Sequence, residues 1–296
     1  MSTLDRIAEW GDWLRIDKQP ATVTGYLWEL RKVEDFFRDK PVMDLTTADL
    51  ARYIAHRRVM QQCSDATVRR TVNALKSFYV YALGKKSPAG KLPVPTAKKR
   101  KQRTLNWEQF SLLIQSCDTS RAVGRRDLAL ICLATDTGLR EAEICRLTLA
   151  DVDMEHCCLT VTIKGGDDGD GVFGLDTRAF VATWIATRAL YVQTGVDTLF
   201  VSVGGERPGT PITPSGLRVI FRRLAKQAGF ERLSPHDLRR SFATLSSKIG
   251  APSRLIQAAG RWSDIRMVET YTRAIEASDF APYSPVTHSL KLKHGG

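Results

Sequence analysis

Residues 137–143 read Thr-Gly-Leu-Arg-Glu-Ala-Glu, a glycine turn followed by the expected start of a helix. Arg140 lies at that start, where the first backbone N–H groups have no partner inside the helix. A guanidinium beside free N–H groups favours the binding of a phosphate. Glu143 comes one turn later, where its carboxylate is able to orient the arginine. Alone the motif is weak, because Arg-x-x-Glu most often marks a surface ion pair.

A second basic pattern, Ser-Pro-His-Asp-Leu-Arg-Arg, occupies residues 234–240. Ser234 is a good cap, and Pro235 suits the first position of a helix. His236 and Arg239 then share one face of that helix. A histidine beside an arginine near a helix start suits acid–base chemistry on a phosphate. The residues alone leave an exposed basic helix start equally open.

Three further residues have side chains that suit the same chemistry. Lys164 ends an alternating strand and is the only lysine between residues 126 and 226. A lone ammonium on a hairpin donates a proton if its pKa is lowered, although a solvated turn lysine is the simpler interpretation. Trp262 and Tyr271 are nine residues apart, and both are residue types that ordinarily pack against a core. Their meaning therefore depends on the other motifs.

Residues 105–280 are predicted to form a mainly helical domain with a small antiparallel sheet. Asn106 is a good N-cap for the first helix. The apolar period changes to two at residues 158–163, which predicts a strand. The sequence Asp-Asp-Gly-Asp-Gly at 167–171 is typical of a turn, so residues 172–175 are expected to return as the paired strand. Other helices are predicted near residues 126–135, 177–193, 214–228, 235–248, 252–259 and 265–276.

Residues 1–87 are predicted to form a small all-helical DNA-binding domain. Its helices are expected near residues 3–17, 21–38, 47–59 and 64–82. In the last helix apolar residues recur at helical spacing, at Val68, Val72, Leu75, Tyr79 and Ala82. The other face is predicted to read a DNA groove, although a solvated face is the alternative. It carries Arg69, Arg70, Asn73 and Lys76.

Residues 88–104 are predicted to be a basic linker between the two domains. Glycines and prolines interrupt the helical pattern in its first half, at Pro88, Gly90, Pro93 and Pro95. The second half is strongly basic, at Lys98, Lys99, Arg100, Lys101 and Arg103. Such a linker is able to lie along a phosphate backbone and bind DNA. A disordered spacer is the plainer interpretation.

The net charge of +12 favours a polyanionic partner. Residues 1–104 carry 21 Lys and Arg against 11 Asp and Glu, whereas the remainder carries 23 against 21. A positive field attracts nucleic acid, and binding of DNA releases counterions. Charge alone leaves a solvated, soluble surface equally open.

Composition disfavours several other classes of protein. No run of ~18 apolar residues is present, so no membrane span is expected, and the first residues lack the pattern of a signal peptide. The six cysteines are irregularly spaced. Adjacent side chains at His156, Cys157 and Cys158 would point to opposite faces of a strand, which disfavours a shared metal ion. We therefore expect a reduced, cytoplasmic protein without a metal site.

Together these residues resemble the active site of the tyrosine recombinases, also called the lambda-integrase family. The catalytic set of that family is Arg, Lys, His-x-x-Arg, His or Trp, and Tyr, in that chain order. The same order is found here in Arg140, Lys164, His236, Arg239, Trp262 and Tyr271. The resemblance covers residues 105–276. The helical N-terminal part resembles the SAM-like core-binding domain of the family at the level of the fold.

The chain departs from the family pattern in two respects. Many members have Leu-Gly-His where this chain has Ala-Gly-Arg-Trp at residues 259–262. The nine-residue step to Tyr271 puts Trp262 at the histidine position, as in Cre-like members, while Arg261 stays open as the functional residue. The chain also begins almost directly with the core-binding helices. We therefore expect the simpler Xer-like or transposon-type layout, without an arm-binding domain.

The resemblance implies a site-specific recombinase that cleaves and rejoins DNA strands, for integration, excision or resolution of DNA. It implies that Tyr271 attacks the scissile phosphate and forms a 3′-phosphotyrosyl intermediate, a reaction that requires neither ATP, nor a divalent metal, nor another cofactor. The other implied roles are phosphate binding by Arg140 and Arg239, proton transfer by His236 and Lys164, and hydrogen bonding by Trp262, with Glu143 as an accessory residue.

The implied partner is double-stranded DNA with specific recombination sites. Because recombination joins two duplexes, the resemblance implies self-association into a tetramer on two sites. The C-terminal tail at residues 281–296 would dock on a neighbouring protomer or fray as a terminus. Accessory proteins are unknown.

Two other functions would share these features. A type IB topoisomerase-like or telomere-resolving enzyme would use similar chemistry, and relaxation of any supercoiled plasmid would identify the former. A non-catalytic DNA-binding regulator that kept an old fold would form no covalent adduct. A full set of six candidate residues disfavours the regulator.

Overall fold

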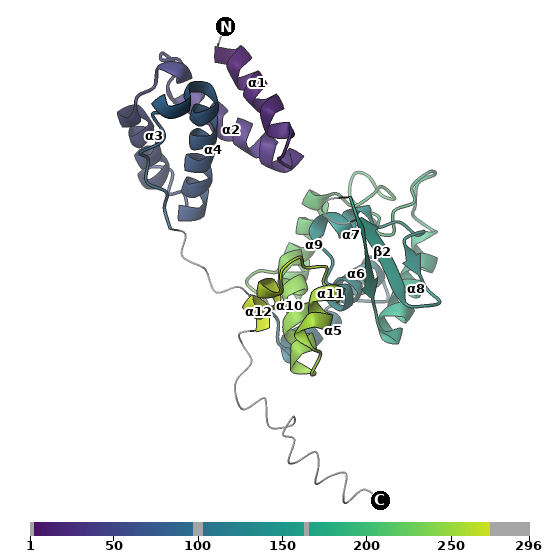
Figure 1. Ribbon diagram of the computed structural model, residues 1–296. Coiled ribbons are helices and arrows are strands. Elements are labelled where there is room, and N and C mark those ends of the chain that lie inside the picture. Colours follow the sequence, from purple (N-terminus) through teal and green to yellow (C-terminus); the bar gives the residue numbers. More distant parts are fainter. Residues whose placement is uncertain (1–2, 97–102, 163–165, 273–296) are drawn as a thin grey trace, which may run out of the picture. The chain divides into compact units, whose positions relative to one another are not determined.

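The computed structural model describes residues 3–96, 103–162 and 166–272 (Figure 1). The chain divides into two compact units, residues 1–101 and residues 102–296. The predictions for Lys164, for Lys98, Lys99, Arg100 and Lys101, and for the tail at 281–296 fall outside the described residues.

The first unit is built from helices, which the apolar periodicity predicts to within a few residues. They are α1 (Thr3–Arg15), α2 (Pro20–Phe36), α3 (Thr47–Val59) and α4 (Asp65–Leu83), with short 3-10 turns at Val42–Asp44 and Gly84–Lys86. Local capping explains two of the starts. The Asp49 N–H donates to the Thr46 hydroxyl while the Asp49 carboxylate accepts from the Thr46 N–H, and the Ser64 hydroxyl accepts from the Thr67 N–H.

A buried ion pair ties three helices of this unit together. Glu29 of α2 and Arg57 of α3 are 1% and 2% exposed, with 3.4 Å between Nη2 and Oε2. Thr71 of α4 donates its hydroxyl to the same carboxylate oxygen at 2.8 Å. Breaking a buried pair by removing one partner leaves an unpaired buried charge. The arrangement therefore fixes α2, α3 and α4 against one another.

The second unit contains the small sheet and more helices. The helices are α5 (Trp107–Gln115), α6 (Ala122–Thr137), α7 (Glu141–Arg146), α8 (Leu175–Arg188), α9 (Pro214–Gln227), α10 (Pro235–Lys248), α11 (Ser253–Ala259) and α12 (Ile265–Thr272). The strands are β1 (Val152–Asp153), β2 (Cys158–Thr162) and β3 (Asp168–Val172), all antiparallel in the order β1-β2-β3. The predicted fold class, mainly α with a small antiparallel sheet, is confirmed.

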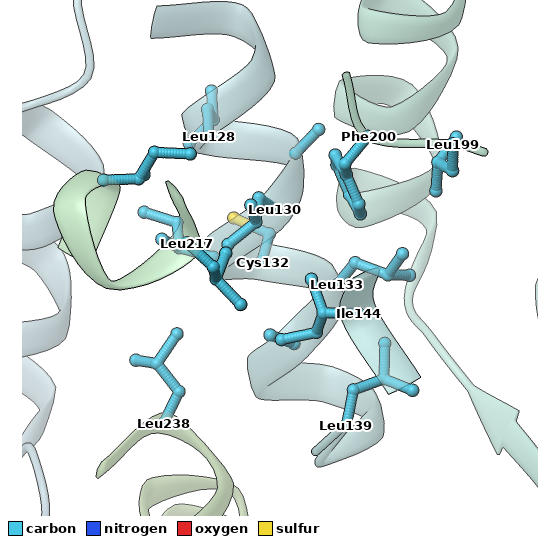
Figure 2. Close-up of a cluster of buried hydrophobic side chains, with 14 of the residues drawn as sticks. Leu128, Leu130, Cys132, Leu133, Leu139, Ile144, Leu199, Phe200, Leu217 and Leu238 are labelled. Carbon is cyan, nitrogen blue, oxygen red and sulfur yellow. The ribbon is translucent and has the colours of Figure 1, made fainter. Parts of the chain in front are cut away.

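Helix α6 is the centre of this unit and is buried along almost all of its length. It packs against α8 and α10. Figure 2 shows Leu130 and Cys132 of α6 among apolar side chains from other elements, including Leu217 of α9 and Leu238 of α10. Because α6 is held on several sides, the turn that follows it at Gly138 is held as well. That turn carries Arg140.

The returning strand lies earlier in the chain than predicted. Residues 168–172 form β3, with Thr162 opposite Asp168 and Cys158 opposite Val172. The prediction of a turn over 167–171 and a strand over 172–175 was therefore wrong, because pairing with β2 overrides the turn preference of Asp and Gly. At Gly171 a Cβ would lie 3.0 Å from Thr137 and 3.1 Å from Arg261. The glycine thus admits a close approach rather than a turn.

Two absences hold for the part of the chain that the structure describes. No helix there is long and apolar enough to cross a membrane. In the same residues, no group of three or more His, Cys, Asp or Glu side chains is placed to hold a metal ion.

Candidate active site

Arg140 lies at the N-cap of α7 and is held from two sides. Its backbone N–H donates to Glu143 Oε2 at 2.8 Å, and its Nη1 donates to Glu143 Oε1. Its Nη2 donates to the carbonyl oxygen of Arg261 at 3.2 Å. The Arg140 side chain is 35% exposed. A guanidinium has five N–H donors, so this half-exposed side chain keeps donors free for an anion.

Glu143 is a buried carboxylate between two arginines. It accepts from Arg140, and its Oε2 lies 3.4 Å from Arg261 Nη2. Burial by itself would raise its pKa, but the hydrogen bonds from Arg140 and the charges of Arg261 and Arg140 outweigh it and lower the pKa. Glu143 therefore stays ionised and orients Arg140, as the spacing predicts.

At the start of α10, His236 is exposed to solvent whereas Arg239 is buried. Ser234 caps the helix through Asp237, and His236 in the first turn is exposed. Arg239 is 4% exposed and donates from Nη1 to the Gly138 carbonyl and from Nη2 to the Gly260 carbonyl, the latter at 2.6 Å. Arg239 thus joins the turn that carries Arg140 to the loop before α12.

The electrostatics of this cluster favour an anion. Burial, and then the charge of Arg140, lower the pKa of Arg239 to about 9. A guanidinium with a lowered pKa is one whose charge is poorly stabilised where it stands. Although His236 is exposed overall, partial burial of its ring, and then the charges of Arg240 and Arg239, lower its pKa from 6.5. A bound phosphate would stabilise the charged form of the arginines. His236, with its lowered pKa, carries no charge at neutral pH.

Trp262 and Tyr271 complete the cluster from the C-terminal side. The Arg239 guanidinium lies 4.6 Å from the centre of the Trp262 ring. The Tyr271 ring, on α12, lies 5.7 Å from the Trp262 ring, and the Thr244 hydroxyl of α10 donates to the Tyr271 carbonyl at 2.8 Å. Within the described residues the Trp262 indole N–H donates no hydrogen bond to another group.

A cavity of about 390 Å³ opens beside these residues. Arg140 and Trp262 line it, together with residues 168–170 of β3. The pocket thus has an aromatic wall at Trp262, and its lining combines the guanidinium groups of Arg140 and Arg261 with the carboxylates of Asp168 and Asp170. Its guanidinium groups are able to bind an anion, and the ring of Tyr271 lies 5.7 Å from the Trp262 ring.

Comparison with known proteins identifies the family. The model of the "Phage integrase family" matches residues 103–277, and the model of the "Phage integrase, N-terminal SAM-like domain" matches residues 14–89. The chain belongs to the phage integrase family. The recombinase is thus an enzyme that cleaves and rejoins DNA, which confirms the predicted family and activity.

The relatives of this recombinase include Xer proteins from several bacteria. It is 30% identical over 277 residues to tyrosine recombinase XerC of Corynebacterium efficiens, which covers 91% of this chain and 86% of the relative. It is 29% identical over 260 residues to XerC of Alcanivorax borkumensis, covering 86% of this chain and 83% of the relative. The Xer-like part of the predicted resemblance is confirmed.

Solved structures with the same fold include complexes with DNA. One is XerH site-specific recombinase bound to a palindromic difH substrate, with a TM-score of 0.69, 21% identity, and coverage of 90% of this chain and 80% of that one. Another is a lambda integrase dimer bound to a core site, with a TM-score of 0.72, 16% identity, and coverage of 93% and 79%. At these identities the likeness concerns the fold alone.

The structure brings together five of the six predicted catalytic residues of the recombinase. Arg140, His236, Arg239, Trp262 and Tyr271 belong to one unit and line one region, as described above. The sixth, Lys164, falls between β2 and β3, on residues that are not described. Their catalytic roles stay predictions.

Arg261 is the residue whose place the sequence least indicated. It has a left-handed backbone, with φ 55°, and a side chain only 3% exposed. Its guanidinium is bound to backbone carbonyls and to Glu143. In the sequence, this position was marked only by an arginine directly before Trp262, where the Leu-Gly-His pattern has glycine.

The predicted DNA contacts of the recombinase are placed as follows. Arg69, Arg70 and Asn73 are exposed on α4, and Lys76 is half-buried, while the apolar face of α4 is buried. Arg103, in the second unit, lies over the Phe230 ring at 5.0 Å. DNA binding by these residues stays a prediction.

Proposed function

We propose that the recombinase cleaves one DNA strand by attack of the Tyr271 hydroxyl on the scissile phosphate. The tyrosine oxygen forms a bond to phosphorus, the bond from phosphorus to the 5′ oxygen breaks, and the 3′ end stays on the protein as a phosphotyrosine. A free 5′ hydroxyl from the partner duplex then reverses the step. The observation that carries the proposal is the contact of the Tyr271 ring with the Trp262 ring, which lies against Arg239.

Each neighbouring group has a role in this step. Arg140 and Arg239 bind the non-bridging oxygens and offset the charge that builds in the transition state, each contributing ~3–4 kcal/mol. Trp262 donates its indole N–H to the same phosphate. The arginines supply positive charge without ATP or a divalent metal.

Two proton transfers accompany the attack. A phenol with a pKa of ~10 keeps its proton at neutral pH, so the attack needs an acceptor. His236, whose lowered pKa keeps it neutral, is the proposed acceptor. Lys164 is the proposed donor to the leaving 5′ oxygen.

The proposed substrate is double-stranded DNA that carries a specific recombination site, in the cytoplasm. Two neighbours of the same fold, XerH and lambda integrase, were solved on such sites. The net charge of +12 suits a DNA partner. Because two duplexes exchange strands, we propose four protomers on two sites, which sedimentation of the protein with two site-bearing duplexes would measure.

Trapping of the covalent adduct tests the proposal. The protein is incubated with fragmented genomic DNA and denatured, and the DNA that stays linked to protein is digested with protease and sequenced at its 3′ ends. We expect ends clustered at one sequence and a peptide that contains Tyr271. Chelation with EDTA is expected to leave the yield unchanged.

Matched tyrosine variants complete this test. Tyr271→Phe should abolish the adduct while DNA binding stays near the wild-type level. Tyr191→Phe, at another partly exposed tyrosine, should change neither. An adduct that survives in Tyr271→Phe would show that the nucleophile is wrong. Relaxation of a plasmid that lacks the mapped site would favour a topoisomerase-like activity instead.

A further inference from the structure

Arg261 binds three segments that are distant in the sequence. Its Nη1 donates to the Asp170 carbonyl of β3 and to the Ala259 carbonyl, each at 3.0 Å. Its Nη2 donates to the Thr137 carbonyl at 3.0 Å and lies 3.4 Å from Glu143 Oε2. The end of α6, the sheet and the loop before α12 therefore meet on one guanidinium.

Arg261 and Arg239 bind neighbouring carbonyls on the same two segments. Arg239 takes the carbonyls of Gly138 and Gly260, whereas Arg261 takes those of Thr137 and Ala259. Two buried arginines thus hold the same pair of loops. Arg239 also contacts the Trp262 ring. The Arg261 side chain is 3% exposed, and its guanidinium binds groups in the protein interior.

The side chain and the backbone carbonyl of Arg261 both help to hold Arg140. Its side chain pairs with Glu143, the carboxylate that binds Nη1 of Arg140. Its own carbonyl accepts the hydrogen bond from Nη2 of Arg140. The two groups that fix the Arg140 guanidinium are therefore a carboxylate held by Arg261 and an oxygen that belongs to Arg261.

The backbone of Arg261 indicates that its side chain is the reason for its place. A φ of 55° lies in the left-handed region, which glycine adopts without strain and other residues disfavour. Here an arginine occupies the left-handed region, and its side chain is buried, which lowers the pKa of its guanidinium. Strain that persists at a site is compensated by what the side chain does there.

We propose that Arg261 is a positioning residue for the reaction: it sets the direction in which Arg140 presents its free N–H groups to the scissile phosphate. The inference rests on the proposed function of the site. It excludes the alternative in which Arg261 itself replaces the histidine of the family pattern. A displacement of about 1 Å in a catalytic group slows a reaction by up to ~10²-fold.

The test compares two substrates under single-turnover conditions at saturating protein. Both are nicked duplexes built on the mapped site, one with a scissile phosphodiester and one with a neutral methylphosphonate at that position. A methylphosphonate lacks one negative oxygen, so it depends far less on a guanidinium that offsets charge. Arg261→Gln should slow the phosphodiester by ~10²-fold and the methylphosphonate by less than ~3-fold, with DNA affinity unchanged.

The opposite outcomes overturn the proposal. An equal loss on both substrates would assign Arg261 a merely structural role, and an undiminished phosphodiester rate would assign it none. Arg254→Gln, at an exposed arginine on the neighbouring helix α11, is the matched control and should leave both rates near wild type. If thermal melting shows that Arg261→Gln does not fold, Arg261→Lys is compared in the same way.

The failure of the proposed function would look different. In that case the wild-type protein would form no adduct through Tyr271 on the phosphodiester. A wild-type adduct with equal losses in the Arg261 variant would overturn the positioning role alone. As a second measurement, Arg140→Lys and Arg261→Gln are combined. If Arg261 acts through Arg140, the double variant is slower than Arg140→Lys by less than ~3-fold.

Discussion

The ring of Tyr271 lies 5.7 Å from the ring of Trp262, centre to centre, and the two planes meet at 50°. Both side chains come from the same unit of one chain, and Val268, one turn before Tyr271, is fully buried against the same cluster. Helix α12 is thus anchored with its tyrosine ring against Trp262. The proposed nucleophile and the arginines therefore belong to one unit of one chain.

The indole N–H of Trp262 is expected to matter more than the packing of its ring. Trp262→Phe keeps an aromatic ring against Phe242 and Tyr271 but removes the donor, so it should slow adduct formation by ~10²-fold with a small change in melting temperature. Trp262→Ala should also destabilise the protein by ~3–5 kcal/mol. Trp107→Phe, at an exposed tryptophan, is the control. A full rate in Trp262→Phe would rule out the donor role.

The cleavage rate is expected to depend on pH through His236. Partial burial of the ring, and then the charges of Arg240 and Arg239, lower its pKa from 6.5. The imidazole is therefore neutral above pH 6.5, in the form that accepts a proton. The rate should be level from pH 7 to pH ~8.5 and fall as the pH drops through a midpoint below 6.5. Single-turnover cleavage between pH 5 and 9 measures this. A rate that rises on acidification would make His236 an acid instead, and His236→Asn should lose the inflection.

An inorganic anion is expected to stabilise the protein through Arg140 and Arg239. Burial and the charge of Arg140 lower the pKa of Arg239 to about 9, and an anion between the two relieves that cost. At tenfold its Kd, sulfate or tungstate should add about 1.4 kcal/mol to the stability, seen as a higher melting temperature. Arg239→Gln should lose this gain, whereas Arg222→Gln, at an exposed position, should keep it. Equal gains in both variants would place the anion elsewhere.

Glu143→Gln is expected to destabilise the second unit as well as slow cleavage. The substitution removes a buried charge that pairs with Arg140 and with the 3%-exposed Arg261. Loss of one partner of a buried pair costs ~3–5 kcal/mol, which urea unfolding at pH 7 would measure. Because the pKa of Glu143 is lowered, its contribution is complete at neutral pH and is lost only as the pH falls through that lowered pKa. Glu231→Gln, at an exposed site, should cost little, and an equal cost in both variants would contradict the role of the pair.

The sequence indicated most of the helices because their signals are local. Apolar spacing and caps such as Asn106 and Ser234 are read within a few residues, and both of these residues cap a helix in the structure. The return strand was missed because its pairing is not local. In β3 the alternate positions are Gly169 and Gly171, so no apolar period marks the strand, and only the partner strand β2 defines it.

The difference between local signals and non-local contacts also explains which features of the site the sequence predicted. The chain order of Arg140, His236, Arg239, Trp262 and Tyr271 predicted which residues to examine. It did not predict that Arg239 would use two donors on the carbonyls of Gly138 and Gly260. Such bonds are made to backbone atoms, which every residue has. No residue type in the sequence therefore marks them.

The contact between Gly25 and Arg70 allows the predicted DNA face of α4 to be tested without touching a charged residue. A Cβ at Gly25, on α2, would lie 1.8 Å from Nη2 of Arg70 and 2.9 Å from its Cζ. The exposed guanidinium is the flexible end of a long side chain, so it would move aside. Gly25→Ala should therefore keep the fold, and alanine favours a helix over glycine by up to ~1 kcal/mol.

Gly25→Ala is expected to weaken DNA binding if Arg70 contacts a phosphate in the position that it occupies here. The dissociation constant for the mapped site should rise, and the slope of its logarithm against log salt should shrink by about one, while the melting temperature stays level or increases. Gly11→Ala on α1 is the matched control, because its Cβ would meet Leu27 at an ordinary 3.5 Å and no arginine guanidinium any closer than 3.9 Å. If the affinity and the salt slope are unchanged in Gly25→Ala, Arg70 does not contact DNA from the position that it occupies here.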